Sequence, residues 1–241
     1  MKHIDVHGMY FKDLNQIIRL SKDQHIELKD VEGQRYIGCG LSGKVIDIYG
    51  TPGNALGACL DGTQIIVHNN AQDATGDTMN DGAIIIHGSC GDAAGYSMRG
   101  GKIFIRDSAG YRTGIHMKAY QEKQPLLVIG DRAGSFLGEY QAGGTIIVLG
   151  LHQDGKPPVG YFCGTGMHGG KIFLRCDNLP RDLPEQVVAQ TAMEEDLKEI
   201  SAPIEEFCKA FSLDKDAVMQ QHFFVLTPNT SNPYKQLYTY V

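Results

Sequence analysis

The sequence lacks several features that would assign it to a common class of protein. It has no tryptophan among its 241 residues, and no apolar run approaches the roughly 20 residues that span a bilayer. The first residues, Met1 to Val6, do not have the composition of a signal peptide. Lysine and arginine are scattered and the net charge is −6, so no positive field gathers phosphate backbones. We therefore expect a cytoplasmic protein that binds neither membranes nor nucleic acid.

Close pairs of cysteines are also absent. Iron–sulfur and zinc sites usually take two ligands from one short segment. The six cysteines of this chain are far apart and include no Cys-x-x-Cys pair: Cys39, Cys59, Cys90, Cys163, Cys176 and Cys208. We therefore expect reduced thiols, and no bound cluster or metal in this chain.

Glycine, by contrast, is abundant and regularly spaced. There are 30 glycines, well above the average usage of roughly 7%, which indicates repeated tight turns because glycine reaches positive φ without steric cost. One glycine column consists of Gly57, Gly76, Gly95, Gly114, Gly138 and Gly164. Three residues after each of these stands a large residue, which is Leu or Met in every copy except Gln141.

Seven strand-like runs of six residues keep the same period. Aligned without gaps, they end at Gly50, Asn69, Gly88, Asp107, Gly130, Gly150 and Cys176, so the steps are 19, 19, 19, 23, 20 and 26 residues. The coincidence of the two registers predicts a stack of equivalent coils, with loop insertions in the later ones.

The second and fourth positions of these runs are aliphatic in every copy. Side chains on a strand alternate between faces, so both columns are expected to point inward. Ile65, Ile84 and Ile103 then become stacked neighbours about 4.8 Å apart. Each buried aliphatic side chain contributes roughly 1.5–3 kcal/mol, and several stacked coils are needed to offset the cost of ordering the chain. The pattern predicts a mainly β protein with a parallel β-helix over residues 37–176.

The third position of the runs faces outward by parity, yet it is apolar in six of the seven copies. Monomers rarely expose such a stripe, so either a segment of this chain or another subunit must cover it. The apolar members are the candidate interface residues: Ile66, Ile85, Phe104, Leu127, Ile147 and Phe173.

Two flanks complete the predicted organisation. Residues 1–36 are expected to form a small α/β cap with a strand from Ile4 to Val6, a helix with Leu14, Ile17 and Ile18 on one face, and a strand from Ile26 to Leu28. Residues 177–241 are expected to form a helical tail with a closing strand from His222 to Thr227.

Two helices are predicted in this tail. The first begins at Pro184, and its apolar face carries Val187, Val188 and Thr191. The second is capped by Ser201 and enters through Pro203, and its face follows helical spacing with Ile204, Phe207, Cys208 and Phe211. Either helix is a candidate cover for part of the outer stripe.

Candidate catalytic groups are sparse. His68 and His87 occupy one column a coil apart and could hold a metal, but the next member of that column is Arg106. Asp73, Asp77 and Asp92 lie in turns, where aspartate is common for local hydrogen bonding. We favour surface histidines and structural turns, keep an independent metal-binding enzyme as an alternative, and assign no catalytic, cofactor-binding or metal residue.

Two segments carry a family resemblance. Residues 91–105 and 159–173 resemble the GXGXG repeats of the C-terminal β-helix domain of the glutamate synthase large subunit. The match covers roughly residues 37–176, and the whole chain resembles the stand-alone form of that domain found in archaea and anaerobic bacteria. The C subunit of formylmethanofuran dehydrogenase carries a similar repeat. The resemblance implies a right-handed, single-stranded parallel β-helix.

The resemblance also implies a role. In that family the domain is mainly architectural, beside a glutaminase and an FMN-binding barrel with an iron–sulfur cluster. Family glutaminases use a cysteine at the processed amino terminus, whereas position 2 here is Lys2, so no active-site residue is carried over. We expect a non-catalytic scaffold subunit of a glutamate synthase or a related amidotransferase-linked flavoenzyme, with FMN and iron–sulfur in partner subunits. Formylmethanofuran dehydrogenase and N-methylglutamate synthase are alternative assemblies.

Overall fold

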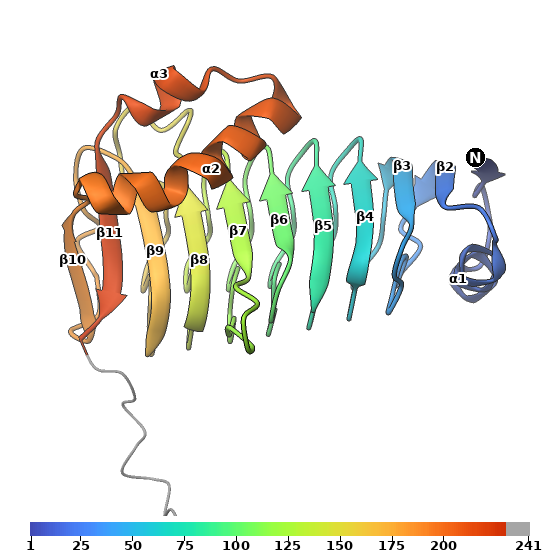
Figure 1. Cartoon of the computed structure of the whole chain (residues 1–241), viewed down its shortest axis with the longest axis horizontal. Coiled ribbons are helices and arrows are strands. Elements are labelled where there is room, and N and C mark those ends of the chain that lie inside the picture. The colour runs from blue at the N-terminus through green and yellow to red at the C-terminus, as the bar shows by residue number, and fades with distance from the viewer. Residues whose placement is uncertain (230–241) are drawn as a thin grey trace, which may run out of the picture.

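One large sheet organises the chain, of which the computed structural model describes residues 1–229. Its strands are β1 (Lys2–Asp5), β2 (His25–Glu32), β3 (Val45–Thr51), β4 (Asp61–Val67), β5 (Asp81–Ile86), β6 (Lys102–Ile105), β7 (Leu126–Ile129), β8 (Ala142–Val148), β9 (Gly169–Arg175), β10 (Val187–Thr191) and β11 (Phe223–Pro228). The order in the sheet is β1 to β9, then β11 and β10. Neighbours from β1 to β9 are parallel, and β11 is antiparallel to both of its neighbours. The protein is therefore mainly β, with one mostly parallel sheet (Figure 1).

The first 36 residues extend this sheet and close one end of its core. The expected strand, helix and strand are present as β1, α1 (Phe11–Leu20) and β2. Leu14 and Ile18 of α1 are fully buried and belong to the same apolar cluster as Ile26 and Leu28. Because β2 pairs with both β1 and β3, the sheet continues without a break into the repeats. The division at residues 36 and 176 stays a prediction.

Each strand and the segment leading to the next strand form one coil, and successive coils stack in register. Ile65 pairs with Ile84 and Ile84 with Ile103, so the expected stacking of the inner columns is confirmed. All three side chains are fully buried.

A second row of parallel bridges joins the coils outside the main strands. It links Ala71, Cys90, Ala109, Ala133 and Val159 in that order, and we call it the second ladder. Backbone pairing outside the main sheet thus also joins these five coils, which helps the stack keep its register.

Each coil turns through three left-handed residues at alternate positions. In the coil that follows β4 they are Ala74, Gly76 and Thr78, with φ of 56°, 72° and 53°. This conformation costs a residue that has a side chain roughly 1–2 kcal/mol. Glycine does not carry this cost. A Cβ on Gly76 would also lie 2.4 Å from Cδ1 of Ile103. The middle position therefore requires glycine for space as well as for conformation, which accounts for the regular glycine column.

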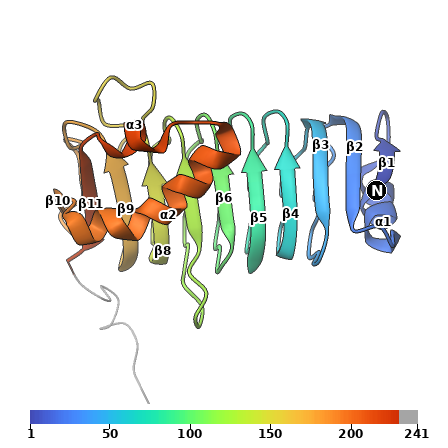
Figure 2. The same cartoon turned by 45° about the horizontal axis from the view of Figure 1, so that its top comes forward.

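The predicted register is wrong by one residue at β7. Leu127 pairs with Ile103 and Ile146, and Val128 pairs with Phe104 and Ile147. Leu127 is thus an interior residue, and Val128 takes its place on the outer stripe. The physical cause is the insertion before β7, where Tyr120 and Lys123 pair in a small antiparallel hairpin, visible in Figure 2 as a green projection below the strands. A one-residue slip moves every side chain of a strand to the opposite face.

Alanine substitutions distinguish the two registers of β7. Leu127→Ala removes a fully buried side chain, and we expect it to lower the free energy of unfolding by about 2–3 kcal/mol. The matched control is Leu126→Ala, whose side chain is only partly buried on the outer face, and we expect a loss of about 1 kcal/mol. Urea denaturation measures both values. A larger loss at Leu126 would restore the register predicted from the sequence.

The C-terminal part contains two helices, α2 (Glu194–Phe211) and α3 (Lys215–Met219), between β10 and β11. The closing strand is confirmed as β11, which pairs with β9 and β10. The prediction of a helix beginning at Pro184 is wrong, because Val187–Thr191 is the edge strand β10. Its valines are β-branched residues that favour strands. A segment of five residues is also too short for the spacing of its apolar residues to distinguish a helix from a strand.

The second predicted helix is present but begins earlier than expected. α2 starts at Glu194 instead of near Ser201, and Pro203 lies inside it. The backbone N–H of Met193 donates to Oδ2 of Asp196 at 3.0 Å, which stabilises the true N-terminus. The buried face of α2 carries Ile204, Phe207 and Cys208 as expected, together with Ile200. Of the helices within residues 1–229, none combines the length and the hydrophobicity needed to cross a bilayer.

Candidate subunit-docking surface

The outer stripe runs along the exterior of the sheet, one residue from each strand. Cross-strand pairing places its members in one row: Asp47, Ile66, Ile85, Phe104, Val128, Ile147 and Phe173. The row continues into Val225 of β11, which pairs with Phe173. Apart from Asp47, the stripe is an apolar surface that needs a cover.

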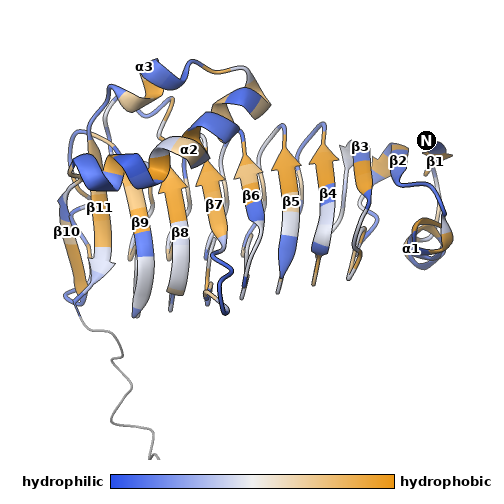
Figure 3. Ribbon diagram, in the orientation of Figure 1, coloured by the Kyte–Doolittle hydropathy of each residue, from blue (hydrophilic) through white to orange (hydrophobic). Residues whose placement is uncertain are grey.

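Helix α2 supplies that cover for the C-terminal half of the stripe. Phe104, Val128, Ile147 and Phe173 are at most 2% exposed and share one apolar cluster with the buried face of α2. The rings of Phe104 and Phe207 meet edge to face, with centroids 5.7 Å apart. Figure 3 shows α2 lying across the apolar segments of these strands.

Ion pairs hold both ends of α2 to the sheet. Lys171 of β9 lies 2.6 Å from Oε2 of Glu199 and 3.5 Å from Oδ1 of Asp196. Lys102 of β6 pairs with Glu206. Exposed pairs contribute little individually, so apolar burial carries most of the attachment and the ion pairs orient the helix.

This arrangement corrects the interface assigned from the sequence. Phe104, Ile147 and Phe173 are buried beneath the chain's own helix, and Leu127 is inside the core, so none of the four lies on the outer surface. The reason is that the amphipathic tail supplies an apolar face of the right length. Ile66 and Ile85 remain half-buried, with Ile85 at the edge of the α2 cluster.

An aromatic stack borders this uncovered end of the stripe. His68 and His87, which occupy one column on adjacent coils, stack with ring centroids 5.5 Å apart. Tyr49 stacks on the other face of His68 at 4.3 Å, and Phe211 of α2 meets His87 edge-on at 5.0 Å. The imidazoles therefore face each other as parallel plates instead of converging on a common point.

Asp47 organises the polar edge of this stack. Its carboxylate lies 2.7 Å from Nε2 of His25 and 2.8 Å from Nε2 of His68. Burial opposes ionisation of Asp47, but the hydrogen bonds from His68 and His25 outweigh burial, and the net pKa lies below its ordinary value. Within residues 1–229 no group of three or more His, Cys, Asp or Glu side chains is arranged to hold a metal ion.

The turn aspartates have structural hydrogen bonds. Oδ1 of Asp73 accepts from the backbone N–H of Asp92 at 2.9 Å, and Oδ1 of Asp92 accepts from that of Tyr111 at 2.8 Å. Each carboxylate thereby joins its coil to the next. Asp77 instead accepts a bond from the hydroxyl of its neighbour Thr78. Burial raises the pKa of the Cys90 and Cys163 thiols to about 12, so these two remain protonated and unreactive at neutral pH.

His87 makes stability depend on pH. Burial lowers its pKa below the ordinary value, and the charges of His68 and Arg106 lower it further. Because the unfolded state then binds this proton more readily, stability is lost as pH falls through about 6.5. We expect the melting temperature of His87→Gln to fall less than that of the wild type between pH 7 and 5.5. His7→Gln, at an exposed position, should leave the wild-type dependence unchanged, and identical pH profiles for all three proteins would contradict this role.

Sequence reasoning missed an aromatic row on the turns. Tyr111 and Tyr161 are 56% and 69% exposed, and Phe162 is 49% exposed. Phe162 packs beside Phe136 at 5.2 Å, and the guanidinium of Arg112 lies 5.6 Å from the Phe136 ring. Aromatic residues and arginine are the types most enriched at protein interfaces. The available signal lay in the two columns before the glycine column. Phe136 and Phe162 stand where earlier coils carry alanine, and Tyr111 and Tyr161 stand where earlier coils carry Asn or Asp.

Comparisons with known proteins agree with this architecture. A protein of Methanocaldococcus jannaschii, named Uncharacterized protein MJ1350, is 45% identical over 249 residues, covering 98% of this chain and 95% of that protein. A solved chain of the formyltransferase/hydrolase complex from Methylorubrum extorquens, in complex with methylofuran, has a TM-score of 0.67 at 18% identity and covers 92% of this chain and 88% of its own. At that identity the likeness shows a shared fold. The GXGXG motif family matches residues 25–230, from β2 through β11, and the chain therefore belongs to this family.

Proposed function

We propose that this chain is a non-catalytic scaffold subunit of a multi-subunit glutamate synthase or a related amidotransferase-linked flavoenzyme. The observation that carries the proposal is the family match, which extends over the whole coil stack. Its expected partners are a glutaminase subunit and a subunit holding FMN and an iron–sulfur cluster. The chemistry would reside in those partners, and this chain would hold them in a fixed relation.

The surfaces of the coil stack support such a role. Backbone pairing in the sheet and the second ladder makes the stack stiff along its length. The half-buried Ile66 and Ile85 and the exposed Tyr111 and Tyr161 lie on separate faces, the sheet and the turns. A stiff body with two separate apolar or aromatic surfaces can contact two partners at once.

A second candidate is a β-helix subunit of an assembly of the formylmethanofuran dehydrogenase type. It is favoured by the structural likeness to a chain of the formyltransferase/hydrolase complex. The two candidates share a scaffold role and differ in the partners.

We further infer that the coils wind as a right-handed, single-stranded parallel β-helix in the cytoplasm. Crossovers between parallel strands of one sheet are right-handed in about 98% of cases. The six unpaired cysteines agree with a reducing compartment. A crystal structure tests the handedness directly, and a left-handed crossover between β4 and β5 would overturn it.

Native purification of the tagged chain, followed by mass spectrometry of the subunits and a flavin and iron assay, tests the function. We expect co-purification with a glutaminase and a flavin-containing subunit, and conversion of glutamine and 2-oxoglutarate to glutamate by the complex. The isolated chain should not catalyse this reaction. Turnover by the isolated chain would refute a scaffold role, and a molybdenum or tungsten subunit in the purified complex would favour the second candidate.

A further inference from the structure

The second ladder ends at Val159 with one side unpaired. One coil earlier, Ala133 is bonded to this coil through both backbone groups: its N–H donates to the carbonyl of Pro158 at 2.9 Å, and its carbonyl accepts from Gly160 at 3.0 Å. In the part of the chain that the structure describes, neither the N–H nor the carbonyl of Val159 has a hydrogen-bond partner. Unpaired strand groups of this kind are a template for an added strand.

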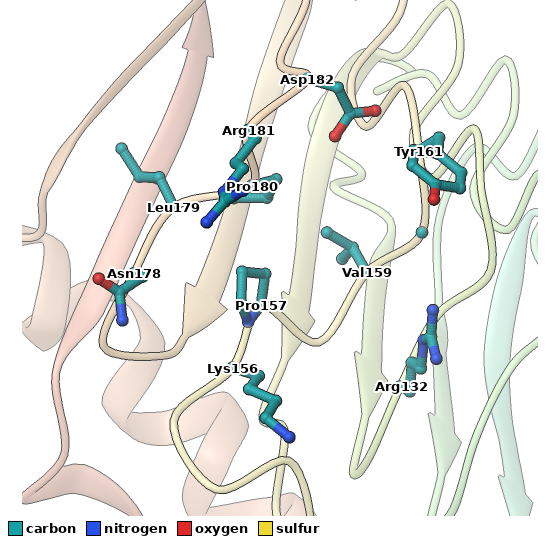
Figure 4. A pocket seen from close by; sticks show the side chains of 11 residues that line it. Arg132, Lys156, Pro157, Val159, Tyr161, Asn178, Leu179, Pro180, Arg181 and Asp182 are labelled. Carbon is teal, nitrogen blue, oxygen red and sulfur yellow. The ribbon is translucent and has the colours of Figure 1, made fainter.

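A groove lies where the next coil would continue the ladder. It has a volume of about 730 Å³ and is lined on one wall by residues 156, 157 and 159–161 and on the other by residues 178–182, as Figure 4 shows. Oδ2 of Asp182 accepts from the backbone N–H of Phe162 at 2.6 Å, which replaces the carbonyl of a missing coil. The backbone N–H of Phe162 is thus hydrogen-bonded within the chain, whereas the N–H and the carbonyl of Val159 are not.

Three cations surround this groove. Arg132, Lys156 and Arg181 line it and are exposed, and none of their charged groups has an ion pair or hydrogen bond with another described residue. The carboxylate of Asp182 is the nearby opposite charge in the lining, and it is already engaged by Phe162. Three cations against one carboxylate leave the lining with a net positive charge in a protein of net charge −6, and such a cleft attracts a ligand of negative charge.

The groove also extends along the stack, from one coil to its neighbours. A neighbouring hollow of about 350 Å³ shares Arg132, Gly160 and Tyr161 with it and includes Tyr111. The two exposed tyrosines therefore line a path that crosses several coils. This path runs across the direction of a strand added beside Val159, so it accepts that strand's side chains and not its backbone.

We propose that this groove binds an extended, carboxylate-rich segment of a partner subunit. The segment adds a strand beside Val159, so that its backbone completes the second ladder. Its Asp or Glu side chains pair with Arg132, Lys156 and Arg181, for which arginine offers a bidentate geometry. Residues 230–241 contain no Asp or Glu, so the chain's own end does not have this chemistry. The proposal rests on the scaffold role and specifies the chemistry of one partner.

Peptide binding to the intact chain tests the groove. The probe is a fluorescein-labelled peptide of alternating Glu and Val, and the readout is its Kd by fluorescence anisotropy. We expect Arg132→Gln/Lys156→Gln/Arg181→Gln to weaken binding at least tenfold. The matched control, Lys22→Gln/Arg99→Gln/Lys118→Gln, removes the same net charge at exposed positions away from the groove and should leave Kd unchanged. A backbone N-methylated probe keeps the charges but not the donors, and should also bind at least tenfold more weakly.

The opposite results would overturn the proposal. Equal binding of the N-methylated probe would exclude strand addition, and binding of inorganic pyrophosphate without binding of the peptide would identify a site for small anions. Entry of the groove triple variant into the native complex with unchanged stability would refute the groove while the scaffold role stands. If the wild-type chain purifies without partners, the scaffold role is refuted. The peptide measurements then still test, independently of that role, whether the groove binds an extended acidic segment.

Discussion

Replacing Gly130 with alanine is expected to lower the free energy of unfolding by about 3–4 kcal/mol, as measured by urea denaturation. A Cβ at this position would lie 1.9 Å from the carbonyl oxygen of Arg106 and 3.1 Å from Cζ of Phe207. The first contact is with the backbone of the preceding coil, which hydrogen bonds hold in place, and the second is with the buried face of α2. The stack would have to open locally to admit one methyl group.

Gly40→Ala is the matched control for this effect. Gly40 has φ of +63°, and a Cβ there would meet nothing within 4 Å. We expect a loss of only about 1 kcal/mol, from the left-handed conformation alone. Equal losses at the two positions would show that the close contact of coils at Gly130 relaxes without cost, contrary to our expectation.

Phe207→Ala is expected to lower the free energy of unfolding by about 3–5 kcal/mol. Phe207 is fully buried and contacts the rings of Phe104 and Phe211. Its loss leaves a cavity between α2 and the outer stripe. We also expect increased binding of a hydrophobic dye, because a loosened α2 exposes Phe104 and its neighbours.

Leu213→Ala controls for a general effect of truncation in this region. Leu213 follows α2 and is 36% exposed, so we expect a change within about 0.5 kcal/mol. A loss below 1 kcal/mol at Phe207 would mean that α2 is weakly attached. The stripe would then be available to a partner that displaces the helix, as the sequence alone allowed.

The parts of the fold that could be predicted are those that the sequence repeats many times. A single run such as Ile84-Ile85-Ile86 does not distinguish a strand from a buried helix, but the same alternation recurs at a fixed spacing with glycine in step. The stacking of Ile65, Ile84 and Ile103 followed directly. The glycine column also gave the correct spacing across the insertion before β7. Gly114 and Gly138 are 24 residues apart, as are the paired Ile103 and Leu127, whereas the aligned runs predicted a spacing of 23.

The features that failed to follow from the sequence occur once each. Five residues at Val187–Thr191 become a strand because β11 lies beside them, and their own pattern does not contain that information. Gln141, the exception in the large-residue column, is fully buried. Its Nε2 donates to the carbonyls of Gly143 and Gly144 at 3.3 and 3.1 Å, which accommodates the amide nitrogen in an apolar column, whereas its buried Oε1 has no hydrogen-bond partner among the described residues.

The sequence by itself determined the coil repeat, the inward columns of every strand except β7, the glycine turns and the family, because periodic burial and backbone conformation are local properties that each copy reinforces. Only the tertiary structure decided what covers the outer stripe and where the ladder ends. An apolar face such as Phe104 and Ile147 can be buried equally well by its own tail or by another chain. An open edge such as Val159 exists only because the segment that follows turns away, and contacts between residues far apart in the chain decide both outcomes.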